Sequence, residues 1–247
     1  MYVNLDMYTI LIMLIALCLG GFTKGVISWG FPLVSLPILT IALPPTSAIF
    51  LLFFPIIFAN IREIKIKNGK TYKKLIPFSL GIFCGIIIGS VIFHTSNSDI
   101  ISIAIGITII ICGVINFVGF KINEKYLLKP FFGLSYGLLS GIIGGMTTVL
   151  GPFMIIYLVS LNLSKSIFSE FVSLAVFSTL IPLYGMFFIY QDVVISDFFA
   201  SGLALIPALL MQFLGLKIRN IIPQEKFRKM TLTLLITVGF LVIFKNF

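Results

Sequence analysis

Charged side chains are scarce in this sequence: Asp, Glu, Lys and Arg make up only 10% of its 247 residues. A soluble domain carries about a quarter charged residues, so the composition argues against one. Histidine occurs once, and the three cysteines lie in apolar runs at unrelated spacings: Cys18, Cys84 and Cys112. We therefore expect no zinc site, redox motif, other metal site or cofactor. We also expect no enzyme, because one histidine and one carboxylate within an apolar run do not provide a nucleophile and its base.

Apolar residues are what the chain has in abundance. They make up 59% of it, and the mean hydropathy is +1.18. Helices that are apolar on all sides belong in lipid, and about 20 residues span the hydrocarbon of a bilayer. Five apolar runs each fit one crossing: 75–93, 99–120, 166–190, 195–216 and 230–247. The sequence predicts an all-α, multi-pass protein of the cell membrane that is surrounded by the lipid bilayer.

The formal net charge is +9, but the placement of the basic residues does not indicate a nucleic-acid partner. Basic residues gather in three short segments between apolar runs: 62–74, 121–129 and 217–229. Such clusters mark cytoplasmic loops by the positive-inside rule. Segments 94–99 and 191–197 contain neither Lys nor Arg. These two segments are therefore expected to be external.

Two longer apolar stretches, 7–60 and 130–161, are interrupted by glycine, proline, serine and threonine. The interruptions share the spacing Gly-x3-Gly-x6-Pro in two copies that lie 120 positions apart: Gly21, Gly25 and Pro32, then Gly141, Gly145 and Pro152. Each copy is followed by three apolar spans. This pattern indicates two membrane repeats, 1–120 and 121–247.

The loop charges give these repeats opposite orientations. Residues 46–60 cross once, from outside to inside, so the broken segments 7–42 and 130–161 each have to make an even number of crossings. The first repeat therefore begins outside and the second begins inside. The sequence thus predicts two inverted-topology repeats, each a glycine/proline-broken helical hairpin plus three transmembrane helices. Each hairpin is either re-entrant or a pair of short crossings, and both arrangements satisfy the charges.

Paired breaks at matching positions are typical of transport sites, because the free N–H groups of half-helix N-termini attract anions. Close helix packing through Gly-x3-Gly is the alternative explanation. The candidate substrate-binding residues flank the two breaks: Gly21, Lys24, Gly25, Ser28, Trp29, Gly30, Gly141, Gly144, Gly145, Thr147, Thr148 and Gly151.

Two charged residues stand out because they lie within apolar runs. Lys24 could pair with an anionic substrate, or it could extend to the external surface. Glu170 could carry a coupling proton, or it could form a structural pair with Lys165. His94 is at the edge of a span and is expected to be a solvated loop residue. Three amides are expected mainly to pack between helices: Asn60, Asn116 and Gln212.

The two glycine-rich segments resemble those of the sulfite exporter TauE/SafE family. They read Gly20-Gly21-Phe-Thr-Lys-Gly25-Val-Ile-Ser-Trp-Gly30-Phe-Pro-Leu and Gly137-Leu-Leu-Ser-Gly141-Ile-Ile-Gly-Gly145-Met-Thr-Thr-Val-Leu-Gly151-Pro. The family usually has denser glycine runs where this chain has Ser28-Trp29-Gly30-Phe31 and Met146-Thr147-Thr148. The resemblance extends over the whole chain and implies transport of sulfite, organosulfonates or related small anions.

The leading hypothesis is therefore a secondary transporter of a small anion, with a proton or another cation as the coupling ion. The sequence contains no phosphate-binding loop, which excludes a fused ATPase. A non-transporting membrane assembly or biogenesis protein is one alternative, and an intramembrane enzyme is another. A homo-oligomer is compatible with each of these hypotheses.

Overall fold

The computed structural model is all-helical over the residues that it describes, which are 6–61, 63–64, 75–118, 126, 129–147, 151–161, 165–219, 221 and 233. These residues form α1 (Met7–Ile27), α2 (Phe31–Leu39), α3 (Pro45–Leu51), α4 (Phe53–Ile61), α6 (Ile76–Thr95), α7 (Ser98–Val118), α9 (Pro130–Thr147), α10 (Gly151–Ser160), α11 (Lys165–Tyr190) and α12 (Ile195–Ile218). No strand occurs among them, as the composition predicts.

Four helices are long and apolar enough to cross a membrane: Met7–Ile27, Ile76–Thr95, Ile167–Tyr190 and Ile195–Ile218. The last three match the predicted spans 75–93, 166–190 and 195–216. The predicted span 99–120 coincides with α7, whose apolar part runs partly outside the described side chains. The predicted span 230–247 lies outside the described residues, Thr233 excepted. A multi-pass helical membrane protein is thus confirmed.

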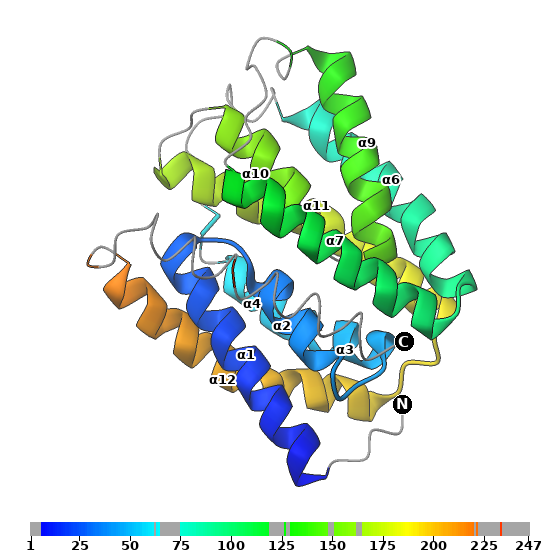
Figure 1. Ribbon diagram of the computed structural model, residues 1–247, viewed down its shortest axis with the longest axis vertical. Coiled ribbons are helices and arrows are strands. Elements are labelled where there is room, and N and C mark those ends of the chain that lie inside the picture. Colours follow the sequence, from blue (N-terminus) through cyan, green and yellow to red (C-terminus); the bar gives the residue numbers. More distant parts are fainter. Residues whose placement is uncertain are drawn as a thin grey trace.

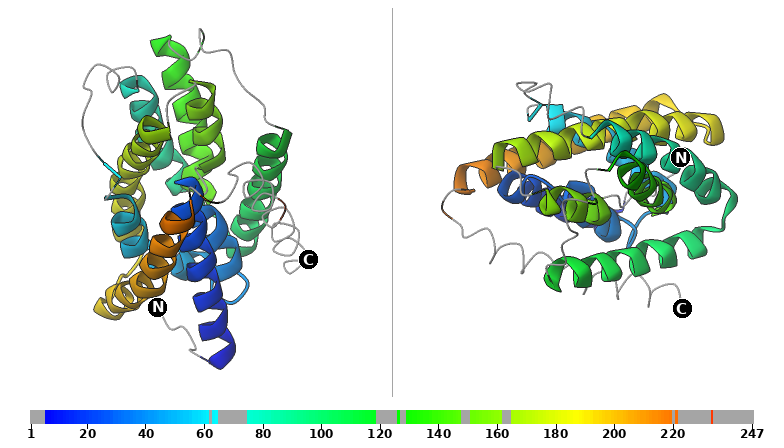
Figure 2. Two further views of the ribbon diagram at one scale, coloured as in Figure 1. Left: turned by 90° about the vertical axis from the view of Figure 1, so that its left-hand side faces the viewer. Right: turned by 90° about the horizontal axis from the view of Figure 1, so that it is seen from above.

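The helices form two bundles, which Figure 1 shows one above the other. The first bundle contains α1, α2, α3, α4 and α12, and the second contains α6, α7, α9, α10 and α11. The first bundle includes α12 from the second part of the chain, which packs against α1, and the second bundle includes α6 and α7 from the first part, of which α6 packs against α9. The blue and orange helices also lie side by side in both views of Figure 2. Each bundle therefore contains helices from both parts of the chain.

The pair α1 and α12 is held close by glycines. A Cβ atom at Gly21 would overlap the carbonyl oxygen of Ala208, and one at Gly25 would overlap that of Gln212. From the other helix, a Cβ atom at Gly215 would lie 2.5 Å from Phe22 O. Such close backbone approach is what small residues permit at helix interfaces in membranes. The contacts advance in the same direction along both helices, so α1 and α12 are parallel.

The pair α6 and α9 repeats these contacts. A Cβ atom at Gly141 would overlap Ile82 O, and one at Gly145 would lie 2.5 Å from Ile86 O. From the other helix, Gly89 approaches Ile142 O. Adding 120 to the residue numbers of α1 and subtracting 126 from those of α12 gives the contacting residues of α9 and α6. These two helices also run in the same direction.

The end of α6 meets the end of α11 around His94. At one end, the Gln191 side-chain amide lies 3.2 Å from His94 Nδ1, and the His94 ring stacks on Tyr190 with centroids 4.9 Å apart. Segments 94–99 and 191–197 therefore start at the same end, as their charges predict. The expectation that His94 is a solvated loop residue is wrong, because it is half-buried among aromatic rings.

Candidate functional site

The first break lies between α1 and α2, at residues 28–30. Ser28 ends α1 in the left-handed conformation with φ 71°, and its N–H donates to Lys24 O at 2.9 Å. Gly30 follows with φ 93° and begins α2, in which Pro32 occupies the first turn as predicted. Glycine adopts positive φ at little cost, and proline suits a first turn because its missing N–H would be unpaired there. Ser28 is the one described non-glycine residue with positive φ, which marks the break as strained.

Lys24 lies in the last turn of α1, and its side chain is only 2% exposed. Its ammonium group donates to three oxygens, each 2.7 Å away: Ser28 O, Asn60 Oδ1 and Glu63 Oε2. An ammonium has three hydrogens to donate, so these bonds saturate it. Lys24 therefore does not extend to a surface, and in this structure its counter-ion is a carboxylate of the same chain.

Both bundles contribute to this charge cluster. The Ser173 hydroxyl of α11 lies 3.0 Å from Glu63 Oε2 and 3.2 Å from Asn60 Oδ1, and it can donate to either. Arg219, just after α12, donates from its guanidinium to Ser28 Oγ. The amide of Asn60 is oriented by a second bond, from Nδ2 to Ile56 O at 2.7 Å. Glu63 Oε1 is buried and has no partner among the described residues.

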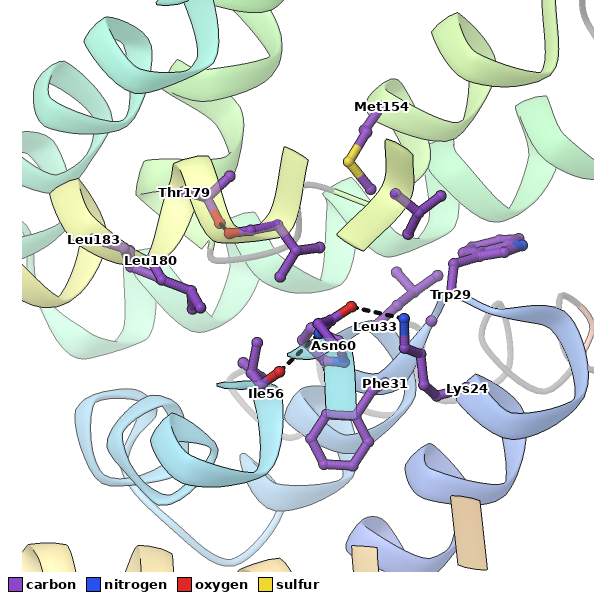
Figure 3. A pocket seen from close by; sticks show the side chains of 14 residues that line it. Lys24, Trp29, Phe31, Leu33, Ile56, Asn60, Met154, Thr179, Leu180 and Leu183 are labelled. Atoms are coloured by element: carbon purple, nitrogen blue, oxygen red, sulfur yellow. Dashed lines mark hydrogen bonds between the residues drawn. The ribbon is translucent and has the colours of Figure 1, made fainter. Parts of the chain in front are cut away.

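A cavity of about 50 Å³ adjoins the cluster between the two bundles. One water needs about 10–15 Å³ on this measure, so the cavity has room for a few waters or one small ion. Figure 3 shows Lys24 reaching Asn60 on its wall, with Trp29 nearby and Thr179 across from them. The lining comes from α1, α2, α4, α10 and α11: Lys24, Trp29, Gly30, Phe31, Pro32, Leu33, Ile56, Asn60, Met154, Val172, Val176, Thr179, Leu180 and Leu183.

The candidate residues of the first break divide between cavity and packing. Lys24, Trp29 and Gly30 line the cavity. Ser28 is fully buried and supports the cluster through its carbonyl and hydroxyl groups. Gly21 and Gly25 instead contact the backbone of α12, as the packing explanation predicts.

The candidate residues of the second break lie mainly in helix packing. Gly141 and Gly145 contact α6, and Gly144 is buried in α9. The hydroxyl of Thr147 donates to Ile143 O at 2.7 Å within α9. Two further candidates close the set: Thr148 lies outside the described residues, and Gly151 is the first residue of α10.

Glu170 is buried in α11, with 7% exposure, and its Oε1 atom has no partner among the described residues. It is not among the described residues that line the cavity. The side chain of Lys165, its alternative structural partner, lies outside the described set, and so does that of Asn116. Gln212 makes the interhelical bond expected of it, from Nε2 to Ala59 O at 2.8 Å.

Sequence reasoning missed Glu63, Arg219 and Ser173. Glu63 and Arg219 fall in the basic segments that were interpreted as cytoplasmic loops. One signal could have identified Glu63, because it follows Asn60 by three positions and so falls on the same side of the chain, one turn beyond it at the end of α4. Its N–H accordingly donates to Asn60 O at 3.0 Å.

A helical membrane protein whose broken helices meet at an internal, partly charged cavity has the architecture of secondary transporters. The chain belongs to the sulfite exporter TauE/SafE family, whose model, described as "Sulfite exporter TauE/SafE", matches residues 12–242. The family is one of transporters, which confirms the resemblance found in the glycine-rich segments. Neither a curated protein nor a solved structure matches the chain.

Proposed function

We propose that this chain is a secondary transporter of sulfite, organosulfonates or related small sulfur-containing anions, and that the cavity between its two bundles is the substrate site. The observation that carries the proposal is the position of Lys24, a buried cation in the wall of a cavity large enough for a small ion. Charged residues at membrane depth are costly and mark substrate or ion pathways. A non-transporting assembly protein has no evident use for such a residue.

The start of α2 adds to the attraction for an anion. Gly30, Phe31 and Leu33 line the cavity, so the first turn of α2 lies on its wall. The first N–H groups of a helix have no partner within the helix, and the positive end of its dipole favours anions. Gly30 supplies no side-chain cap, which leaves these N–H groups to a ligand.

The charge cluster also favours a negatively charged ligand. Lys24 and Arg219 contribute two positive charges, and Glu63 contributes one negative charge. The cluster therefore keeps one positive charge in excess when all three groups are ionised, and a largely apolar setting screens that charge only weakly.

We infer that residues 1–120 and 121–247 are inverted-topology repeats. The matched glycine contacts of the pairs α1/α12 and α9/α6 support this, because inverted repeats that place helices in each other's bundles require equivalent interfaces. The ends of α6 and α11 meet through His94 and Gln191, and α12 starts at that same end. It follows that α12 runs opposite to α6, as an inversion demands.

A coupling proton is part of the proposal, and Glu170 is its candidate carrier from the sequence. The carboxylate is buried and has an unpartnered oxygen that could hold a proton. Glu170→Gln should reduce proton-driven accumulation more than anion exchange at equal pH. An equal loss of both activities would reject a specific coupling role.

The direct test is flux of labelled sulfite and of a small organosulfonate into liposomes that contain the purified protein. Transport should exceed that of protein-free liposomes, and Lys24→Met should abolish it. Gly185→Ala is a matched control, because a methyl group there meets open space. Absence of flux for a broad panel of small anions under every gradient would refute transport.

The topology has its own test, in a variant that lacks the native cysteines. Ile66→Cys and Val194→Cys should react with an impermeant reagent from opposite sides of the membrane. Labelling of both from one side would refute the inverted repeats and leave the transport proposal standing.

A further inference from the structure

The ammonium group of Lys24 lies in the cavity wall, but it has no hydrogen left for a bound anion. All three hydrogens are used by Ser28 O, Asn60 Oδ1 and Glu63 Oε2. An anion in the cavity can therefore pair with Lys24 only if one of these acceptors gives way. The transport proposal, on which this inference rests, thus needs an exchange of partners at Lys24.

Of the three acceptors, Glu63 alone can change its charge. Ser28 contributes a backbone carbonyl at a helix end, and the Asn60 amide is held by its second bond to Ile56 O. Glu63 offers two oxygens, of which Oε2 holds Lys24 and Oε1 is buried without a partner among the described residues. A proton can therefore bind at Oε1 before the bond at Oε2 breaks. Protonation then removes the negative charge that holds the ammonium group.

We propose that Glu63 takes up one proton and releases Lys24, and that the substrate anion then replaces Glu63 as the partner of the ammonium group. The proton comes from water and forms one O–H bond at the carboxylate, which becomes a neutral carboxylic acid. No other covalent bond forms or breaks. The ion pair between Lys24 and Glu63 is replaced by one between Lys24 and the anion. A proton and a monovalent anion then bind together without a change in net charge.

The surroundings of Glu63 favour this exchange. Within the part of the chain that the structure describes, Glu63 forms an ion pair with Lys24 from α1, and Arg219 from the end of α12 joins the same cluster through Ser28 Oγ. From α11 it receives the uncharged hydroxyl of Ser173, and Glu170 lies about one turn earlier on that helix. Neutralising Glu63 leaves Lys24 and Arg219 as two uncompensated positive charges, which strengthens the attraction for an anion.

The exchange predicts a proton count that can be measured on the unmodified protein. Purified full-length protein in weakly buffered detergent solution is titrated with methanesulfonate, thiosulfate or sulfate, because these anions do not titrate near neutral pH. Each bound anion should remove about one proton from solution, and affinity should fall about tenfold per pH unit on the alkaline side. Binding without proton uptake would overturn the role of Glu63 and leave transport intact.

Variants assign the proton to a residue. Glu63→Gln should abolish the dependence of affinity on pH, whereas Glu63→Asp, which still ionises, should keep it. Gly185→Ala should behave as the wild type does. If the pH dependence persists in Glu63→Gln, or disappears only in Glu170→Gln, the inference is wrong.

Two other outcomes are also decisive. If Glu63→Gln does not fold, Glu170→Gln decides the assignment: proton uptake that persists in this variant supports Glu63, and its loss overturns the inference. If the wild-type protein binds none of the three anions at any pH, the proposed function fails, and the exchange at Lys24 fails with it.

Discussion

The helices α1 and α9 pack in the same way but end differently. Each lies parallel to a helix from the other part of the chain, with glycines against backbone carbonyls at matching positions. At the break, however, α1 carries Lys24, whereas the matching position in α9 is Gly144. Neither α9 nor α10 contains a charged residue. The shared positions thus serve the packing of the helices, and the unshared ones place a charge at a single break.

This difference teaches how a repeat can build one site from two similar parts. The glycines set the distance between helices in both bundles, so they have little freedom to differ. The residues at the break are freer, and here they pair a cation with Glu63 on one side of the cavity and leave apolar α10 and α11 side chains on the other. The first bundle would therefore attract an anion by its charge, and the side chains of the second bundle would limit the size of the anion that fits.

The largest effect is expected from removing the charge that distinguishes the two breaks. Lys24→Met leaves the Glu63 carboxylate, which is only 11% exposed, without its ion-pair partner. Breaking a buried ion pair in this way costs about 3–5 kcal/mol. The loss is measured as a lower unfolding midpoint in detergent. Adding Glu63→Gln to this variant removes both charges and should recover most of the stability; a double variant no more stable than Lys24→Met would contradict the pairing.

A somewhat smaller effect tests what the two helix pairs share. Gly25→Ala and Gly145→Ala each place a methyl group against a backbone carbonyl, of Gln212 and Ile86 respectively. Both should destabilise the protein by similar amounts, about 1–3 kcal/mol, because backbone cannot move aside as a side chain can. Thermal unfolding of the two variants provides the measurement.

The matched control for these glycines is Gly202→Ala in α12, where a methyl group meets open space. Its stability should be unchanged or slightly raised, since alanine favours helix over glycine by up to about 1 kcal/mol. Clearly unequal losses in Gly25→Ala and Gly145→Ala would break the equivalence of the two interfaces.

A third substitution makes the two interfaces more alike. Gln212 occupies the position that matches Ile86, and its side chain bonds to Ala59 O. Gln212→Ile should cost about 1 kcal/mol, the usual net value of a hydrogen bond, in the same unfolding measurement. Ile86→Gln should cost more, because it would bury an amide at a site with 0% exposure. The reverse order, with Gln212→Ile as the costlier change, would contradict the ordinary value assigned to this hydrogen bond.

The smallest effect concerns the start of α1. Hydrogen bonds from Thr9, from its side chain and then its backbone, lower the pKa of the Asp6 carboxyl group. A lowered folded-state pKa means that this carboxylate stabilises the fold above its unfolded pKa and ceases to do so as pH falls through the folded value. Asp6→Ala should therefore lower the unfolding midpoint slightly at neutral pH and not at strongly acidic pH. A constant difference across pH would contradict a role for the charge.

Much of the fold could be predicted because lipid demands long apolar helices. The helices α6, α11 and α12 follow directly from uninterrupted runs, and Pro32 marks the start of α2. The partners of these helices could not be predicted in the same way. In lipid every face of such a helix is apolar, so the sequence does not tell which face meets which neighbour.

The site was predictable only in part for a related reason. Lys24 stood out because an apolar run surrounds it. Glu63 and Arg219 did not, since they lie at helix ends among other charges, where most residues are solvated. Their burial depends on the end of α12 meeting the ends of α1 and α4, which is a property of the tertiary arrangement.

The exchange of α12 and α6 between the bundles also bears on how the protein is made. The glycine face of α1 emerges early from the ribosome, but its partner α12 is synthesised only after residue 194. The second bundle, by contrast, consists of helices that are synthesised one after another, from α6 to α11. The bundle that is begun first is therefore completed last. Until α12 is made, lipid or a chaperone has to cover the glycine face of α1.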